Sequence, residues 1–229
     1  MADRRSHTEK KSLSDRIANF IEKQRILLLG IIIAAVVIIV GMAIFTSIKQ
    51  KNTETAIIKS EKMQEYYSDY SSATDDSAKK DIRSKIVSAY DELTKKYSKT
   101  YGAQRAYFIM ANVYWEETDW ANCAQTFRTL GEDFPKGYLA PVALLNSAAA
   151  YEEAGDTDQA LAMYMKVIES FSSDPSAPKA YFSAARVNEV KGNNEEALRL
   201  YKEILQEYQT SNWTKFARSR IIQLELDIQ

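Results

Sequence analysis

Few residues in this chain could carry covalent chemistry. Its 229 residues include one histidine, His7, and one cysteine, Cys123. Catalysis by a Ser-His-Asp or Cys-His arrangement needs a histidine in a structured site, and His7 lies in a polar N-terminal stretch. A zinc site of the Cys/His type and an internal disulfide framework each need several such residues. We therefore predict that the protein is not an enzyme, holds no metal and uses no cofactor.

The glycines and the charges give no sign of nucleotide or nucleic-acid binding. Seven glycines are present, and none forms a phosphate-binding loop or a dinucleotide fingerprint. The formal net charge of −1 provides no basic footprint, so no nucleic-acid partner is expected. The many carboxylates mostly neighbour lysines or arginines on polar helix faces, which is the pattern of a solvated surface.

The strongest pattern in the sequence is an uncharged apolar stretch over residues 26–48. It reads ILLLGIIIAAVVIIVGMAIFTSI, and no charged residue occurs between Arg25 and Lys49. At about 1.5 Å per residue it spans roughly 34 Å as a helix, which is enough to cross the core of a bilayer. A buried core helix would usually keep a polar edge, and a secretory signal peptide would have a shorter apolar region and a cleavage site. We predict an uncleaved transmembrane helix that contacts the lipid bilayer through residues 26–48.

The basic residues on either side of this helix predict its orientation. Residues 1–25 hold seven lysines and arginines, whereas the first stretch beyond the membrane holds four, Lys49, Lys51, Lys59 and Lys62. Positive residues favour the cytoplasmic side, so the N-terminus is expected inside and the large C-terminal part outside.

The N-terminal tail contains a second apolar pattern. Leu13, Ile17, Phe20 and Ile21 fall on one face of a helix. This pattern fits a short amphipathic helix on the inner leaflet, and a frayed cytoplasmic stub is the alternative.

Beyond the membrane helix, one set of residue types recurs every 37 residues. The segment GDTDQALAMYMKVIESF, residues 155–171, returns as GNNEEALRLYKEILQEY, residues 192–208. In these two copies a small residue is followed by three large ones on the same helical face. The successive copies are Ile86, Tyr90, Leu93 and Tyr97; Cys123, Phe127, Leu130 and Phe134; Ala160, Tyr164, Val167 and Phe171; and Ala197, Tyr201, Ile204 and Tyr208. A second register, Ala106, Ala143, Ala180 and Ala217, has the same period, so the chain contains an internal repeat.

The pattern predicts that each unit is a pair of antiparallel helices. Tight turns are expected at Thr118-Asp119, Gly155-Asp156 and Gly192-Asn193. The small residue lies where the two helices cross closely, the next large residue fills the gap between helices, and the following one contacts the next unit. No unit can bury its faces alone, so the units stack into a solenoid. Cys123 is interpreted as a small core side chain in this column, with a reactive thiol as the alternative.

These columns resemble the tetratricopeptide repeat. The large, small and aromatic positions of that family's first helix correspond to Tyr107, Ala111 and Tyr114, and Pro135 stands where the family often has a proline. The resemblance covers residues 98–229 well. It covers residues 52–97 only partly, because SSATDDS interrupts the helix there, and the period has three more residues than is usual. Together with the apolar stretch over residues 26–48, it implies an all-α fold with a single N-terminal transmembrane helix followed by a TPR-like α-solenoid with repeats of about 37 residues.

The predicted organisation has five parts. They are a cytoplasmic basic tail in residues 1–25, the transmembrane helix in residues 26–48, a linker helix and degenerate first repeat in residues 49–97, TPR-like repeats in residues 98–214, and a C-terminal capping helix in residues 215–229.

This layout is similar to that of membrane-anchored bacterial envelope proteins of the YfgM-like type. The resemblance implies a single-pass protein of the bacterial inner membrane with its repeat domain in the periplasm. It also implies a non-catalytic scaffold or adaptor for protein partners, as an ancillary component of a translocon or chaperone network. The alternative is a structural scaffold subunit of an envelope machine, such as a flagellar-motor or division complex.

In the tetratricopeptide family, the first helix of each unit lines a concave groove. Carrying this over gives eleven partner-binding residues: Arg105, Phe108, Ile109, Asn112, Trp115, Val142, Leu145, Asn146, Lys179, Phe182 and Arg186. Several family members grip a peptide's terminal carboxylate through five polar residues, and this chain matches three of the places, with Asn112, Asn146 and Lys179. The favoured hypothesis is an apolar groove that uses Phe108, Trp115, Leu145 and Phe182 to hold an extended or helical segment.

Overall fold

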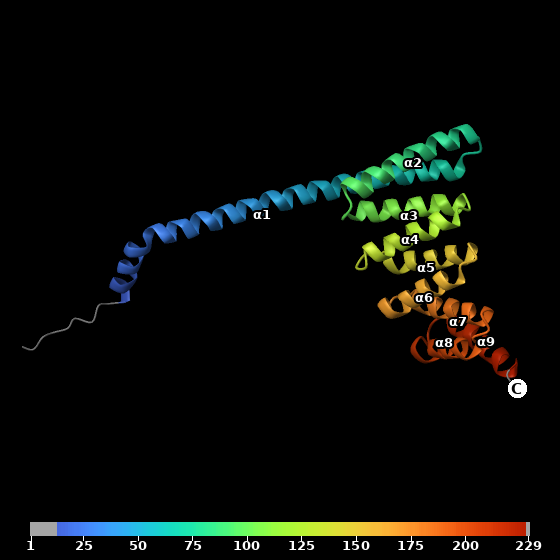
Figure 1. Ribbon diagram of the computed structural model, residues 1–229. Helices are drawn as coiled ribbons and strands as arrows, with labels where there is room; N and C mark the ends of the chain where they lie inside the picture. The colour runs from blue at the N-terminus through green and yellow to red at the C-terminus, as the bar shows by residue number, and fades with distance from the viewer. Residues whose placement is uncertain (1–12, 228–229) are drawn as a thin grey trace, which may run out of the picture. The chain divides into compact units, whose positions relative to one another are not determined.

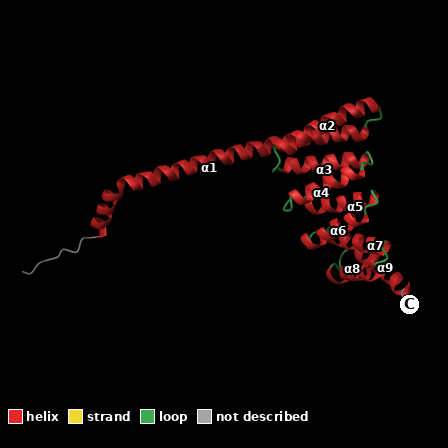
Figure 2. Cartoon of the chain, in the orientation of Figure 1, coloured by secondary structure: helices red, strands yellow, loops and turns green. Residues whose placement is uncertain are grey.

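The structure is a computed structural model that describes residues 13–227, and all the regular secondary structure in this part of the chain is helical (Figure 2). The chain divides into two compact units, Met1–Lys51 and Asn52–Gln229. The predicted basic tail falls partly on residues 1–12, and the end of the predicted cap on residues 228–229, which lie outside the described residues.

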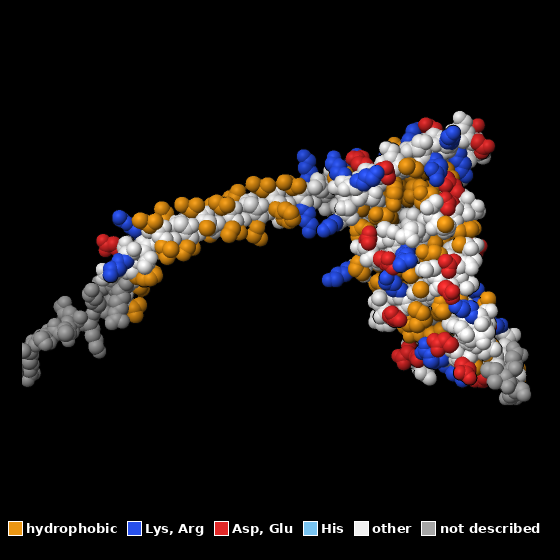
Figure 3. Space-filling view, viewed as in Figure 1, with side chains coloured by type: hydrophobic (Ala, Val, Ile, Leu, Met, Phe, Trp, Pro, Cys, Tyr) orange, Lys and Arg blue, Asp and Glu red, His pale blue; other side chains and the backbone are white. Residues whose placement is uncertain are grey.

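The first helix, α1 (Leu13–Ser72), contains a stretch that is long and apolar enough to cross a membrane (Figure 1). The most apolar part of this stretch is not buried within the protein. Hydrophobic side chains cover this stretch in the space-filling view (Figure 3). The predicted boundaries at residues 26 and 48 fall inside one continuous helix, so the candidate span and the linker helix are parts of the same element.

The end of α1 and the next helix, α2 (Asp76–Lys96), form a hairpin that is longer than a repeat pair. Ala56, Met63 and Tyr70 of α1 are buried at intervals of seven residues, which is the spacing of coiled-coil packing. Ile86 and Leu93 of α2 are spaced in the same way and join the same core cluster. The SSATDDS segment is therefore the turn of this hairpin.

Three helix pairs and a final helix follow, stacked one on the next (Figure 1). They are α3 (Tyr101–Glu116) with α4 (Trp120–Asp133), α5 (Ala140–Glu153) with α6 (Thr157–Ser170), α7 (Ala177–Val190) with α8 (Asn194–Glu207), and α9 (Trp213–Asp227). The second helices start at good N-cap residues: the side chains of Asp119 and Asp156 each accept a hydrogen bond from a backbone N–H three residues later. The fold class predicted from the sequence, an all-α TPR-like solenoid, is confirmed.

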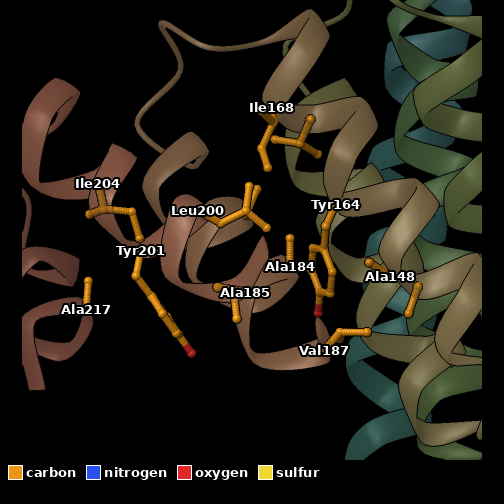
Figure 4. Packing of buried hydrophobic residues seen from close by; sticks show 14 of the residues in the cluster. Ala148, Tyr164, Ile168, Ala184, Ala185, Val187, Leu200, Tyr201, Ile204 and Ala217 are labelled. Carbon is orange, nitrogen blue, oxygen red and sulfur yellow. The ribbon is translucent and has the colours of Figure 1, made fainter. Parts of the chain in front are cut away.

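The predicted small-residue columns lie in the core. All six residues are fully buried: Ala111, Ala148 and Ala185 in the first helices, and Cys123, Ala160 and Ala197 in the second helices. The large residue that follows fills the space between neighbouring pairs. Tyr164 of α6, for example, lies between Ala148 of α5 and Ala184 of α7 (Figure 4). Each pair thus completes its core only with side chains from the next pair.

Cys123 is a core side chain of this kind. It is fully buried, and that burial, reinforced by the nearby Asp119 carboxylate, raises the pKa of its thiol to about 12. A thiol that is buried and protonated at neutral pH is a poor nucleophile.

The turn within each pair places its central residue in the left-handed backbone region. Gly155 and Gly192 have φ values of 79° and 78°, and Thr118, at the equivalent position of the first pair, has a φ of 54°. A β-branched residue is strained in this conformation, whereas glycine adopts it freely.

We therefore expect Thr118→Gly to raise the free energy of unfolding of the repeat unit by about 1 kcal/mol. The measurement is urea unfolding followed by far-UV circular dichroism. Gly155→Ala is the matched control, and it should lower stability by a similar amount because its Cβ meets no neighbour within 4 Å and only the backbone strain remains. A Thr118→Gly variant less stable than wild type would contradict this account of the turn.

Candidate partner-binding groove

The predicted groove residues lie on α3, α5 and α7, the first helices of successive pairs. Trp115, Lys179 and Arg186 are exposed. The half-buried members of the set are Arg105, Phe108, Asn112, Val142, Asn146 and Phe182. These nine side chains keep some surface through which a partner could be contacted.

Two members of the predicted set cannot contact a partner. Ile109 is 2% exposed, and Leu145 is 5% exposed. Ile109 belongs to the core cluster that contains Ala56 and Met63, so the α1–α2 hairpin covers it. Leu145 belongs to the cluster around Tyr164. The prediction was wrong for both, because neighbouring pairs bury these positions.

Trp115, the exposed tryptophan of the predicted set, packs against a second tryptophan. The rings of Trp115, at the end of α3, and Trp120, at the start of α4, meet edge to face with centroids 5.0 Å apart. Trp115 remains 37% exposed. Nearby on α3, Phe108 packs edge to face on the buried Phe127, at 5.4 Å. A large aromatic surface fixed by its neighbours loses little conformational freedom when it binds a partner.

A second aromatic group lies at the C-terminal end of the predicted set. Phe182 of α7 packs against Tyr201, Trp213 and Phe216, with ring centroids 5.0 to 6.2 Å apart. Phe216 is 56% exposed, and the predicted set lacks it because the sequence predicts only a cap over residues 215–229. The repeat period could have found it, since Phe216 follows Lys179 by 37 residues.

Between α5 and α7, a carboxylate joins two repeats. Glu152 of α5 accepts a hydrogen bond from the Tyr164 hydroxyl at 2.6 Å and forms an ion pair with Arg186 of α7. We call this arrangement the tyrosine–carboxylate–arginine link. It engages Arg186, which leaves the guanidinium less available to grip a partner's carboxylate.

The link recurs, with a difference, between α7 and α9. Glu189 of α7 pairs with Arg220 of α9, and Tyr201 occupies the place of Tyr164. Burial raises the pKa of the Tyr201 hydroxyl, and the neighbouring Glu189 carboxylate raises it further. Among the described residues, however, the Tyr201 hydroxyl finds no partner in hydrogen-bond geometry.

One repeat earlier, the same three positions are apolar. Trp115, Phe127 and Ala149 stand 37 residues before Glu152, Tyr164 and Arg186, respectively. We call Trp115, Phe127 and Ala149, together with Phe108, the apolar step. In the described part of the chain, no hydrogen bond or ion pair between side chains joins α3 to α5. The α3–α5 junction is therefore apolar, whereas the α5–α7 and α7–α9 junctions each contain an ion pair.

Polar contacts resume on the other side of the apolar step. Glu117, which follows α3, forms an ion pair with Arg83 of α2 and accepts a hydrogen bond from the Tyr70 hydroxyl at 2.8 Å. The Arg83 guanidinium is the main cause that holds the pKa of Glu117 below its ordinary value, against its partial burial. Arg105 donates to the Ser60 hydroxyl at 3.4 Å. The apolar step is thus bounded by polar contacts on both sides.

The three residues that match the carboxylate-gripping pattern remain available. Asn112 and Asn146 are half-buried, and Lys179 is exposed. None of the three side chains forms a hydrogen bond or an ion pair with another residue in the part of the chain that the structure describes. They could hydrogen-bond the backbone or the end of a bound segment.

Comparison with known families agrees with this architecture. The profile described as "Tetratricopeptide repeat-like domain" matches residues 19–167, and one described as "Tetratricopeptide repeat" matches residues 145–212. The first match alone covers more than half of the chain, so the protein belongs to the tetratricopeptide repeat-like family. Domains of this family generally mediate protein–protein interactions, which makes the chain a scaffold or adaptor. No curated protein matches the sequence.

The two tyrosines of the repeated link should respond differently to loss of the hydroxyl group. Tyr164→Phe removes a hydrogen bond to a carboxylate and should lower the free energy of unfolding by about 1 to 2 kcal/mol. Tyr201→Phe removes a buried hydroxyl without a partner, so stability should stay within about 0.5 kcal/mol of wild type or rise. Urea unfolding of both variants tests this difference. Equal losses would show that Tyr201 is hydrogen-bonded as Tyr164 is.

Proposed function

We propose that this protein is a non-catalytic scaffold anchored in the bacterial inner membrane, whose repeat unit binds protein partners on the periplasmic side. The apolar stretch of α1 supplies the anchor. The family match supports this arrangement, since it begins at residue 19, ahead of the apolar stretch, and continues into the repeats. The excess of lysine and arginine in residues 1–25 favours a cytoplasmic N-terminus.

The observation that carries the binding proposal is the apolar step. Trp115 is large, partly exposed and fixed against Trp120, which are the properties of an interface anchor. The tyrosine–carboxylate–arginine link is absent between α3 and α5, so no ion pair within the described part of the chain competes with a partner for this part of the groove. An extended or helical segment with an apolar side chain fits here, while Asn112 and Asn146 hydrogen-bond its polar groups.

A grip on a terminal carboxylate is the second candidate, and the availability of Lys179 is the observation in its favour. Two of the five places of that pattern are lost, since Phe108 packs on Phe127 and Ser183 is buried. Arg186, one turn from Ser183, is paired with Glu152. The apolar groove is therefore the better supported mode.

The layout favours a role as an ancillary component of a translocon or chaperone network. Such a component holds clients or partner proteins beside the membrane and performs no chemistry itself. A structural subunit of a flagellar-motor or division complex would use the same anchor and groove. Co-purification in mild detergent separates the two roles, through translocon subunits in the first case and motor or division proteins in the second.

We expect Trp115→Ala to weaken partner binding and Lys179→Ala to leave it nearly unchanged. The measurement uses the purified full chain and an array of ten-residue peptides, each synthesised with a free and with an amidated C-terminus. Loss of a central aromatic anchor should reduce affinity by about tenfold or more, for both forms of a peptide. Tyr138→Ala is the matched control, because Tyr138 is 87% exposed but lies in the connector between α4 and α5.

A second variant separates binding from stability. The triple change Trp115→Glu, Phe127→Tyr and Ala149→Arg copies the link of the next repeat into the apolar step, so the fold should persist while binding falls. A strong loss with Lys179→Ala that is confined to free C-termini would instead favour the carboxylate grip. If Trp115→Ala, the triple variant and Lys179→Ala all bind as wild type does, the groove assignment is wrong.

The proposed orientation has its own test. Alkaline phosphatase, which is active only after export, should be active when fused after residue 229. A reporter that works only in the cytoplasm should be silent at the same position. The opposite result would place the repeat unit in the cytoplasm and overturn the proposed localisation.

A further inference from the structure

The last helix, α9, occupies the place of the first helix of another repeat. Ala217 lies 37 residues after Ala180, and both are fully buried against the preceding pair. Within residues 13–227, no second helix follows α9 to cross its outer face. That face is therefore open in the described part of the chain.

The outer face of α9 is not built like the crossing faces of the complete repeats. Ile222 stands 37 residues after Ala185, in a column whose other members are fully buried alanines. A close crossing has no room for isoleucine at this position. Ile222 is 56% exposed, so a helix that packs on this face must lie further away and interleave its side chains, as in a coiled coil.

The outward residues of α9 follow coiled-coil spacing. Lys215, Ser219, Ile222 and Leu226 are separated by four, three and four residues, which places them on one stripe. Leu226 is 67% exposed. A shallow hollow opens beside the stripe, and its lining residues are Thr214, Lys215, Arg218, Ser219 and Ile222. The stripe thus has an exposed Leu226 at one end and, about two turns earlier, a hollow that could receive a side chain of this kind.

The charges along this face oppose the dipole of their own helix. Lys215 and Arg218 lie in the N-terminal half, where the dipole favours acids, and Glu225 lies in the last turn, where it favours bases. Arg218 has no ion pair within the described residues, and Glu225 keeps half of its side-chain surface exposed beside Lys202. An antiparallel helix of the same sequence would bring its acidic end to the basic end of α9 and compensate both.

We propose that α9 pairs with α9 of a second copy of this chain, antiparallel, about a two-fold axis at Ile222. The symmetry brings the two Ile222 side chains together and sets Leu226 of each copy over the hollow beside Arg218 of the other. Glu225 of one copy then lies within a turn of Arg218 of the other. The interface is self-complementary in shape and charge, as a two-fold interface must be.

Disulfide trapping suits this interface, because two apolar side chains per copy make a small contact and trapping accumulates weak pairs. The test uses the purified full chain in detergent, with one cysteine introduced per variant. Cys123 gives little background, since it is fully buried. Ile222→Cys lies at the two-fold axis. Gln223→Cys is the matched control, because the next residue is also exposed but points about 100° away around the helix.

We expect about fivefold more disulfide-linked dimer from Ile222→Cys than from Gln223→Cys, because only cysteines that approach closely can be bridged. Adding Leu226→Glu to Ile222→Cys should reduce the yield to that of the control. Adding Arg218→Glu should also reduce it, and Arg218→Glu with Glu225→Arg should restore it. Circular dichroism verifies that each variant is folded.

Three results would overturn the proposal. The first is no trapped dimer from Ile222→Cys. The second is an equal yield from the two cysteine positions, which would show that the copies meet through another segment. The third is a yield from Ile222→Cys that Leu226→Glu leaves unchanged.

Discussion

The repeat unit depends on the close crossing of the two helices in each pair. Small residues fill this crossing, as at Ala148 and Ala160, which are both fully buried. The next large residue, such as Tyr164, reaches beyond its own pair and also packs against the first helix of the following pair. Burial is therefore shared between neighbours, and a single pair could not retain it alone.

The large residue that follows the small one also determines which side chains can lie next to it at the predicted binding surface. Where it is Tyr164, the buried hydroxyl needs a partner, Glu152 supplies one, and the charge of Glu152 is balanced by Arg186. Where it is Phe127, no hydroxyl needs a partner, and the position of the carboxylate is free to hold Trp115. A change from tyrosine to phenylalanine at one core position thus goes with a change from an ion pair to an apolar surface on the neighbouring first helices.

Sequence periodicity predicted the helix pairs well, because the contacts that define a pair are local and recur at a fixed spacing. It predicted the groove less well, because exposure there depends on what the neighbouring pairs cover. Ile109 is buried by a hairpin whose buried residues repeat every seven positions, so the 37-residue period did not reveal it. Phe216 follows the 37-residue period, but α9 was interpreted only as a cap, so its surface was overlooked.

The two ends of the described stack differ in how closely a neighbouring helix can pack on them. At the first end, α3 approaches α1 so closely that a Cβ on Gly102 would lie 2.3 Å from the backbone oxygen of Ala56. Only glycine permits that contact, and the hairpin completes the core with Met63 and Leu93. At the last end, the residue in the crossing column is large, and Ile222 keeps a neighbouring helix at a distance. The first end is thus sealed within the chain, whereas the last presents a surface shaped for a helix that packs less closely.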